Sequence, residues 1–331
     1  MILAIDVGGT KTLLGLYCKA DNGWSLYKEQ KYKSSDYESI AEILQSFLAK
    51  DFDKQIECVC AGVAGTVIDE SCKITNLTWT ISVAEIQQVT KAKCVYLLND
   101  LAATAWAVAL GDMQYEEINL NANLQLPKNE TIAILSAGTG LGEAILVNTG
   151  NDGYNVLSTE GGHSSFAPQN SEQDRLLAYL RSKYEGHVSY ERLVSGEGLF
   201  NIYSFLQAEG IYTANPEITE KMQKKDPAEV IGSEAMLGQD ELCCNAIQLF
   251  CEVYAAEAGN LALKCLPQSG IVLAGGISPK ILKAIKQPYF IQSFINKGRY
   301  KSFLSGLSIR VCMNDKAVLL GALAFARNQL D

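Results

Sequence analysis

The pattern Asp-x-Gly-Gly-Thr near the start of the sequence has the residue types that bind a nucleotide phosphate. It places Asp6, Gly8, Gly9 and Thr10 between two apolar runs. Glycines let backbone N–H groups approach phosphate oxygens, and the threonine adds a hydroxyl group. The carboxylate of Asp6 could hold Mg²⁺, either directly or through a water molecule. A plain hairpin turn is the competing interpretation.

A second glycine turn, formed by Gly138, Thr139 and Gly140, interrupts another apolar run further along the chain. Together the two turns indicate a nucleotide held between two β-turns, whereas either turn alone is a common feature. Neither has the Gly-Lys-Ser/Thr of a Walker A loop, and no Gly-x-Gly-x-x-Gly leads from a strand into a helix. A Rossmann dinucleotide site is therefore not expected.

A third pair of glycines, Gly275 and Gly276, follows the apolar run at 271–274. Because they carry no side chains, they could lie flat against an adenine or a ribose. A simple strand-to-helix turn is the alternative. In either case Ser278-Pro279 predicts the start of a helix.

Strands and helices that alternate along the chain must position these turns. Residues 2–17 and 131–147 each have the pattern strand, glycine turn, strand, which indicates two halves of similar topology. Further strands are expected at 56–64, 94–98 and 271–276. This alternation is typical of α/β layers.

Helices are expected where apolar residues recur with the α-helical period. One follows a capping box at Ser35 and Glu38, and another follows a capping pair at Ser171 and Asp174. The polar stretch 206–240 should form loops and short helices. The remaining helices are expected at 101–110, 172–184, about 240–264 and about 315–329, the last rich in small residues and therefore closely packed.

Composition and charge exclude several classes of function. The chain has 331 residues, 37 acidic and 28 basic, and its net charge of −9 argues against binding nucleic acid. Apolar residues make up 48 %, enough for a core, and the length predicts two domains. The longest apolar stretch, Leu101–Leu110, is about half a membrane span, and the N-terminal segment has no basic start. Neither a transmembrane helix nor a secretory signal is expected.

The ten cysteines show no metal-binding pattern. There is no Cys-x-x-Cys, and Cys58 and Cys60 alternate within an apolar run. We expect reduced thiols that pack as small apolar side chains in a cytosolic protein. With only two histidines, His163 and His187, a structural metal site is not expected.

Several short segments form a recognisable series along the chain. They are 6–10, 98–103, 138–142, 160–168, 186–196, 259–263 and 274–279. In this order they resemble the bacterial glucokinase family, from about residue 2 to residue 325. The specific parts are Glu-Gly-Gly-His at 160–163 and Gly-His-Val-Ser-Tyr-Glu-Arg at 186–192, because the glycine turns are shared by many sugar kinases and actin-like ATPases. The cysteine-rich zinc motif of the repressor/open-reading-frame/kinase glucokinases is missing.

The resemblance implies an α/β protein with the two-domain actin-like ATPase fold, which is ribonuclease H-like, and an inter-domain cleft. A small α/β domain would take residues 1–111 plus 315–331, and a large α/β domain would take 112–314. Its expected ligands are ATP, Mg²⁺ and glucose, with no nucleic-acid or membrane partner. A cytoplasmic location is expected, and a homodimer is expected from family habit alone.

The resemblance also assigns roles to single residues. Asn99 and Asp100 would contact the far hydroxyls of the sugar, and Glu160, His163 and Glu191 those near the anomeric carbon. Asp100 is the candidate base that accepts the proton of the attacking hydroxyl. It could also be the N-cap of the following helix, where a cap hydrogen bond and the helix dipole would lower its pKa. The phosphates would lie at Gly8–Thr10 and Gly138–Gly140, and the adenosine at Gly275 and Gly276.

Each of these side chains also has an ordinary structural interpretation, and two positions depart from the family pattern. Glu160 could be a turn residue, Glu191 a surface carboxylate and His163 a core histidine. Lys11 stands where the family often has Asn, and would either add charge at the γ-phosphate or point into solvent. Glu197 replaces the proline of a Ser-Gly-Pro-Gly turn, which changes the expected shape of that loop.

The expected function is that of a glucokinase, which transfers a phosphoryl group from ATP to the 6-hydroxyl of D-glucose in the first step of glycolysis. A kinase for another hexose or an amino sugar is the alternative, because Gly-Gly-Thr-Lys-Thr also occurs in acetylglucosamine-type kinases. A sugar-sensing regulator or a bare actin-like ATPase is the other alternative. The acidic charge argues against a regulator that binds DNA.

Overall fold

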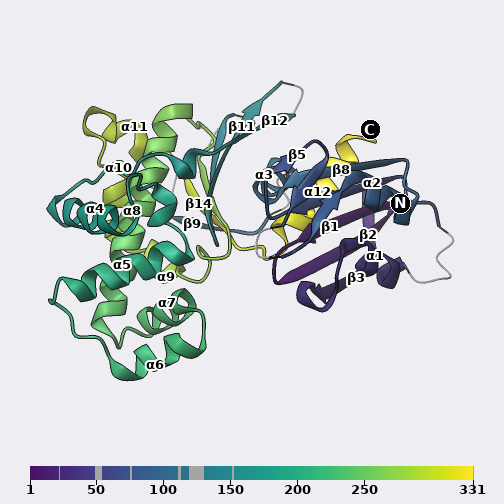
Figure 1. Cartoon of the computed structure of the whole chain (residues 1–331). Coiled ribbons are helices and arrows are strands. Elements are labelled where there is room, and N and C mark those ends of the chain that lie inside the picture. The colour runs from purple at the N-terminus through teal and green to yellow at the C-terminus, as the bar shows by residue number, and fades with distance from the viewer. Residues whose placement is uncertain are drawn as a thin grey trace. The chain divides into compact units, whose positions relative to one another are not determined.

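The residues of the chain cluster into two compact units. Unit 1 comprises Met1–Met113 with Asn314–Asp331, and unit 2 comprises Gln114–Met313. Each contains its own mixed β-sheet with helices packed on it (Figure 1). The expected domain boundary at 111/112 lies outside the described residues. The computed structural model describes residues 1–21, 23–48, 54–74, 77–110, 113–118, 130–150 and 153–330.

Unit 1 is built on a five-stranded sheet with the order β3-β2-β1-β4-β8. The strands are β1 (Ile2–Val7), β2 (Lys11–Ala20), β3 (Gly23–Lys33), β4 (Cys58–Val63) and β8 (Cys94–Asn99). A small sheet is formed by β5 (Val67–Ile68), β6 (Ser71–Lys73) and β7 (Thr80–Ser82). The helices are α1 (Ile40–Leu48), α2 (Val83–Thr90), α3 (Asp100–Leu110) and α12 (Ala317–Asn328).

The helices of unit 1 cover both faces of its main sheet. Side chains alternate between the two faces of a strand, so Leu3 and Ile5 pack with α1 and α2, whereas Ile2 and Ala4 pack with α12. Helix α12 also packs on α3 so closely that a Cβ on Gly321 would overlap the carbonyl oxygen of Ala103. The small residues of α12 thus serve the close packing that the sequence predicts.

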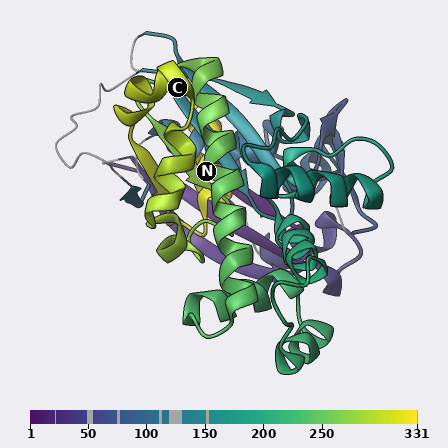
Figure 2. The same ribbon diagram turned by 90° about the vertical axis from the view of Figure 1, so that its left-hand side faces the viewer.

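Unit 2 is built on a six-stranded sheet with the order β12-β11-β10-β13-β14-β9. The strands are β9 (Tyr115–Ile118), β10 (Ile132–Ala137), β11 (Leu141–Asn148), β12 (Tyr154–Thr159), β13 (Ile271–Ala274) and β14 (Ile309–Cys312). The helices are α4 (Ser171–Lys183), α5 (Gly196–Ala208), α6 (Pro216–Lys224), α7 (Pro227–Leu237), α8 (Glu241–Cys265), α9 (Leu282–Ile285), α10 (Pro288–Ile295) and α11 (Lys301–Ser305). The long α8 is buried along much of its length, with α10 alongside it (Figure 2).

The two sheets share one topology, as the two strand–turn–strand segments predict. In each, an antiparallel meander (β1–β3 or β10–β12) is followed by two parallel strands, β4 and β8 or β13 and β14. Carboxyl ends of parallel strands meet at one edge of a sheet, where ligands of α/β proteins bind. Each unit therefore has one edge on which to search for a site.

Two helix caps differ from the expected ones. Ser39 caps α1 by accepting a hydrogen bond from the backbone N–H of Glu42 (3.4 Å), one turn after the expected Ser35. Asn170 caps α4 by accepting from the N–H of Gln173 (2.9 Å), one residue before the expected Ser-Asp pair. Both segments offer two overlapping cap patterns, and packing of the apolar face selects one.

Ser278-Pro279 does not begin a helix, since turns precede α9, which starts at Leu282. Ser278 is instead buried, and its Oγ donates to the carbonyl oxygen of Ala274 (3.2 Å) and lies 3.1 Å from the hydroxyl of Tyr254. The stretch 206–240 contains α6 and α7, each with proline at its start.

No helix within the described residues is long and apolar enough to span a membrane. The ten cysteines are free thiols, and Cys58 and Cys60 are fully buried in β4. In the same described ranges, no group of three or more His, Cys, Asp or Glu side chains could hold a metal ion.

Candidate functional site

Unit 1 brings Asp6, Asn99 and Asp100 to the carboxyl edge of its sheet. The register pairs Val7 of β1 with Val63 of β4, and Val63 with Asn99 of β8, so Asp6 and Asp100 lie close to the same edge. Their charges interact, since the Asp100 carboxyl raises the pKa of Asp6. Two strand ends thus place two carboxyl groups together.

Asn99, and not Asp100, caps helix α3. Its Oδ1 accepts from the backbone N–H of Leu101 (2.9 Å), and its Nδ2 donates to the carbonyl oxygen of Gly65 (3.1 Å), which fixes the amide. The Asp100 Oδ1 also accepts from Leu101 N–H (2.9 Å). The expected lowering of the Asp100 pKa is wrong: burial raises it, and the hydrogen bonds offset only part of this.

Asp6 has the more strongly perturbed carboxyl group. Its pKa is raised from 3.8 to about 6, chiefly by burial and also by the charge of Asp100, while the positive charge of Lys11 offsets part of the rise. Lys11 begins β2, directly after the glycine turn. Its ammonium group therefore acts on the Asp6 carboxyl group.

The Gly8–Thr10 turn is anchored by Ser34, which the sequence analysis missed. The backbone N–H of Gly8 donates to the carbonyl oxygen of Lys11 (2.9 Å), which closes the turn. Ser34 Oγ donates to the carbonyl oxygen of Gly8 (2.8 Å) and contacts Thr12 Oγ1 (3.0 Å). Thr10 is exposed at the tip. The signal for Ser34 would have been its position beside the Gly8–Thr10 turn, which depends on pairing of β2 with β3.

Unit 2 places its two glycine segments at neighbouring strand ends. β10 and β13 are parallel partners, and the N–H of Ile277 donates to the carbonyl oxygen of Ala137 (3.2 Å). Gly275 has φ +83° and a Cβ there would overlap that same carbonyl, so only glycine fits. By contrast, Gly138 and Gly276 have no atom within 4 Å of a Cβ position and leave open backbone at this edge.

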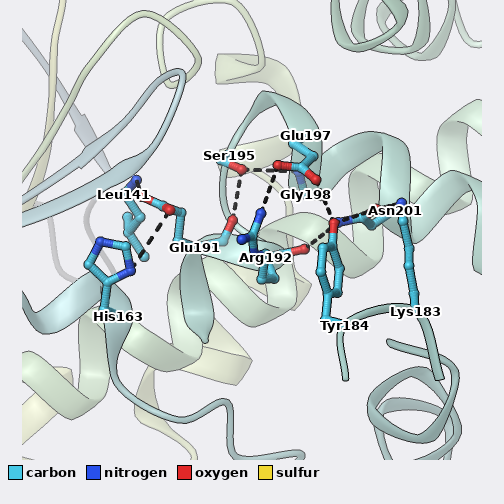
Figure 3. Close-up of polar contacts among 10 residues, drawn as sticks. All are labelled: Leu141, His163, Lys183, Tyr184, Glu191, Arg192, Ser195, Glu197, Gly198 and Asn201. Atoms are coloured by element: carbon cyan, nitrogen blue, oxygen red, sulfur yellow. Dashed lines mark hydrogen bonds and ion pairs between the residues drawn. The ribbon is translucent and has the colours of Figure 1, made fainter. Parts of the chain in front are cut away.

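Glu191 lies between the second glycine turn and His163, one of the side chains expected to bind the sugar (Figure 3). Its Oε2 accepts from the N–H of Leu141 (3.0 Å), and a Cβ on Gly140 would lie 2.5 Å from that oxygen. His163 Nδ1 lies 3.9 Å from Glu191 Oε1, and His163 Nε2 lies 3.9 Å from Glu160 Oε2. Three polar side chains from two segments, 160–163 and 190–192, therefore converge.

The three side chains differ widely in their exposure to solvent. The side chains of Glu160, His163 and Glu191 are 80 %, 59 % and 26 % exposed. His163 is therefore not a core histidine. Its backbone is fixed instead, because its carbonyl oxygen lies 2.8 Å from His187 Nε2. Such a group of acceptors and donors, open to solvent on a fixed turn, suits the hydroxyls of a sugar.

Glu197 does not disturb the loop where the family has proline. Ser195 Oγ accepts from the N–H of Gly198 (3.0 Å) and donates to the carbonyl oxygen of Glu191 (2.7 Å), so α5 begins without a proline. Glu197 lies in the first turn of α5, where its charge suits the helix dipole, and accepts from Arg192 Nη1 (3.0 Å). Figure 3 shows these contacts on the side of Glu191 away from His163.

The family model described as Glucokinase matches residues 3–329. A glucokinase from Nostoc sp. (strain PCC 7120) is 38 % identical over 337 residues, with 97 % of each chain covered. A glucokinase from an Antarctic psychrotroph, solved by crystallography, has 30 % identity and a TM-score of 0.83, covering 99 % of this chain and 98 % of its own.

Two more distant structures show the fold alone. A glucokinase from Balamuthia mandrillaris in complex with glucose has 21 % identity and a TM-score of 0.80, with 98 % and 93 % of the two chains covered. A ROK family glucokinase from Streptomyces griseus, in complex with glucose and AMPPNP, has 19 % identity and a TM-score of 0.64, with 99 % of each chain covered.

Two units with one sheet topology, together with these structural matches, define a sugar kinase with the actin-like two-domain ATPase fold. This confirms the predicted fold class. The full-length sequence matches are more specific, and the chain belongs to the glucokinase family. It is accordingly a kinase, of a family that uses ATP as co-substrate.

Proposed function

We propose that this protein transfers the γ-phosphoryl group of ATP to the 6-hydroxyl of D-glucose, which gives glucose 6-phosphate and ADP. Membership of the glucokinase family supports the reaction. The observation that carries the choice of a sugar is the convergence of Glu160, His163 and Glu191 at a solvent-open turn. This reaction is the first step of glycolysis, and ten free thiols suit the reducing cytoplasm.

In this proposal Asp100 is the general base. Phosphoryl transfer needs positioning and one carboxylate that accepts the hydroxyl proton. Burial raises the pKa of Asp100, which makes its carboxylate a stronger proton acceptor than an ordinary surface aspartate. Asn99, fixed between Gly65 and the start of α3, orients the neighbouring sugar hydroxyl.

The phosphates of ATP are proposed to lie at Gly8–Thr10 and Gly138–Gly140, with the adenosine at Gly275 and Gly276. The open backbone at Gly138 and Gly276 supports this assignment. Asp6 is a suitable ligand for Mg²⁺, which takes oxygen ligands. The ion is usually bound by one or two carboxylates and the substrate phosphates, and it keeps several of its water molecules. When bound, Mg²⁺ neutralises charge on the phosphate oxygens. Lys11 adds a positive charge beside the same carboxyl pair.

A coupled assay for ADP release with a panel of sugars tests the proposal. Glucose should support rapid turnover, and galactose, mannose and N-acetylglucosamine should support much less. Preference for an amino sugar would instead favour the second kinase hypothesis. ADP release that no sugar stimulates would contradict a sugar kinase activity altogether. Sedimentation of the same sample tests the homodimer, which remains a prediction.

A further inference from the structure

A pair of carboxyl groups is buried beneath the turn that carries Glu160 and His163. Glu143 on β11 is 1 % exposed and Glu257 on α8 is 0 % exposed. Glu143 Oε1 is buried and has no hydrogen-bond partner within the described residues, and the negative charge of Glu257 acts on the same carboxyl group. An ionised carboxylate is strongly unfavourable in such a site, so Glu143 carries a proton. The reaction proposed above uses neither residue.

Glu143 supports the 3-10 turn Gly161–His163 from within. A Cβ on Gly161 would overlap Glu143 Oε2, so the carboxyl group lies directly against the backbone of the turn. Thr159 fixes the same contact, because its Oγ1 donates to the carbonyl oxygen of Glu143 (3.1 Å) and accepts from the N–H of Gly161 (3.1 Å). A displaced Glu143 side chain would therefore displace the turn.

Glu257 extends the contact to the segment that carries Glu191. Asn260 Nδ2 donates to Glu257 Oε2 (2.7 Å) and lies within hydrogen-bonding distance of the Tyr190 hydroxyl (2.9 Å). Asn260 thus bridges Glu257 to Tyr190, which directly precedes Glu191. The N–H of Tyr190 donates to the carbonyl oxygen of Ser164, next to the first turn (3.0 Å). One buried cluster thus links both arms of the candidate sugar site.

Two lysines complete the charge around the pair. Lys264 Nζ lies 3.4 Å from Glu257 Oε1, and Lys297 Nζ donates to Asn260 Oδ1 (2.6 Å). Burial and the charge of Glu257 raise the pKa of Glu143 to about 8, and Lys264 offsets part of this. The other titratable groups that interact with the pair are Tyr190, near Glu257, and Tyr254 and Cys265, near Glu143. Glu160 and His163 belong to the turn itself.

We propose that Glu143 is a positioning residue of the sugar site: its protonated side chain, buried against Gly161 and beside Glu257, holds both arms in the geometry that binds glucose. The proposal rests on the function proposed above. Loss of this proton in alkaline solution leaves an ionised Glu143 buried beside the charge of Glu257, and their repulsion moves Glu143 away from Gly161. Glucose binding then weakens, whereas ATP binding, which uses other residues, does not change.

The test is the pH dependence of kcat/KM for glucose in wild type and in Glu143→Gln, whose amide keeps the shape and a donor but cannot ionise. In wild type, kcat/KM should fall as the pH rises through about 8, through a rising glucose KM. This fall should be absent in Glu143→Gln. Glu143→Ala should raise the glucose KM about tenfold at every pH, with the ATP KM unchanged.

Glu116→Gln is the matched control, because Glu116 pairs with Lys286 on the surface of the same unit and should leave the profile as in wild type. Infrared spectroscopy gives an independent readout. At neutral pH the wild type should show the carbonyl band of a protonated carboxyl group, and Glu143→Gln should lack it. If Glu143→Gln does not fold, Glu257→Gln, which also removes one of the two carboxyl groups, should likewise lose the fall at about pH 8.

An identical alkaline fall in wild type and Glu143→Gln, or a wild type without the protonated-carboxyl band, would overturn the proposal. A wild type that binds and phosphorylates no glucose at any pH would instead refute the proposed function. The infrared result does not depend on turnover and separates the two failures.

Discussion

At the Asp100 carboxyl group, burial and hydrogen bonding act in opposite directions, and burial is the larger effect. A carboxyl group that accepts from a helix N–H has a lowered pKa when water still solvates it. Here Asn99 takes the capping position and the Asp100 carboxyl group is buried, so desolvation prevails over the hydrogen bonds that Asp100 accepts. The helix start therefore orients the proposed base without lowering its pKa.

Asp100→Asn keeps the size of the side chain and removes the proton acceptor. Turnover should fall about 10²- to 10⁴-fold, with a smaller change in the glucose KM. Steady-state kinetics of the purified variant measure both. Asp36→Asn, on the surface of the same unit beside Lys33, is the control and should behave as wild type. Asp100→Asn with near-normal turnover would exclude Asp100 as the base.

Asp6 and Asp100 predict an acid limb in the activity profile. The proposed function needs both in the ionised form, Asp6 to hold Mg²⁺ and Asp100 to accept a proton, and both pKa values are raised, that of Asp6 to about 6. The value of kcat/KM for ATP should therefore rise with pH and reach half its maximum near pH 6, as a property of the coupled pair. A limb centred near pH 4, as for ordinary aspartates, would contradict the assignment.

The same raised pKa values have the opposite effect on folding. Between the unfolded value of 3.8 and the folded value of about 6, the folded Asp6 binds more protons than the unfolded one. The free energy of unfolding due to this group therefore falls as the pH rises through that window. Activity and stability thus depend on pH in opposite senses at this carboxyl.

Among the elements, the sequence predicts those whose signal is local. Glycine turns between apolar runs locate β1–β2 and β10–β11, and their shared pattern predicts two sheets of one topology. The predicted positions of two helix caps are wrong by one residue or one turn, because neighbouring Ser, Asn and Glu residues offer equivalent caps. Ser34 and Glu143 are missed for another reason: their roles depend on partners far along the chain, at Gly8 and Glu257. Local periodicity carries no information on such pairs.

The turn after β13 gives a matched pair of substitutions. Gly275→Ala places a Cβ at positive φ against the carbonyl of Ala137 and should lower the free energy of unfolding by about 1–3 kcal/mol. Gly276→Ala meets no atom and should leave stability unchanged, while it raises the KM for ATP if adenosine lies on that backbone. Thermal melts and ATP titrations measure the two effects. Equal melting temperatures for the two variants would contradict the strain at Gly275.

Over the whole molecule, the proposed function requires contributions to glucose binding from both units. Glucose alone should stabilise the native protein by about 2.7 kcal/mol at one hundred times its dissociation constant. Asn99→Ala in unit 1 and Glu191→Gln in unit 2 should each reduce this stabilisation at a fixed glucose concentration. Thermal melts with and without glucose test this, and galactose is the control ligand. If either variant kept the full shift, its unit would not contribute to the sugar site.

The position of helix α12 in the sequence determines when one face of the sheet in unit 1 becomes covered during synthesis. The face of β1 and β4 formed by Ile2, Ala4, Cys58 and Cys60 is buried under a helix from the far end of the sequence. During translation, at about 5–20 residues per second, this face stays uncovered until the residues of α12 have emerged. Unit 2, by contrast, is one continuous stretch of chain. Strands β1 and β4 are thus synthesised long before the helix that completes the cover of this face.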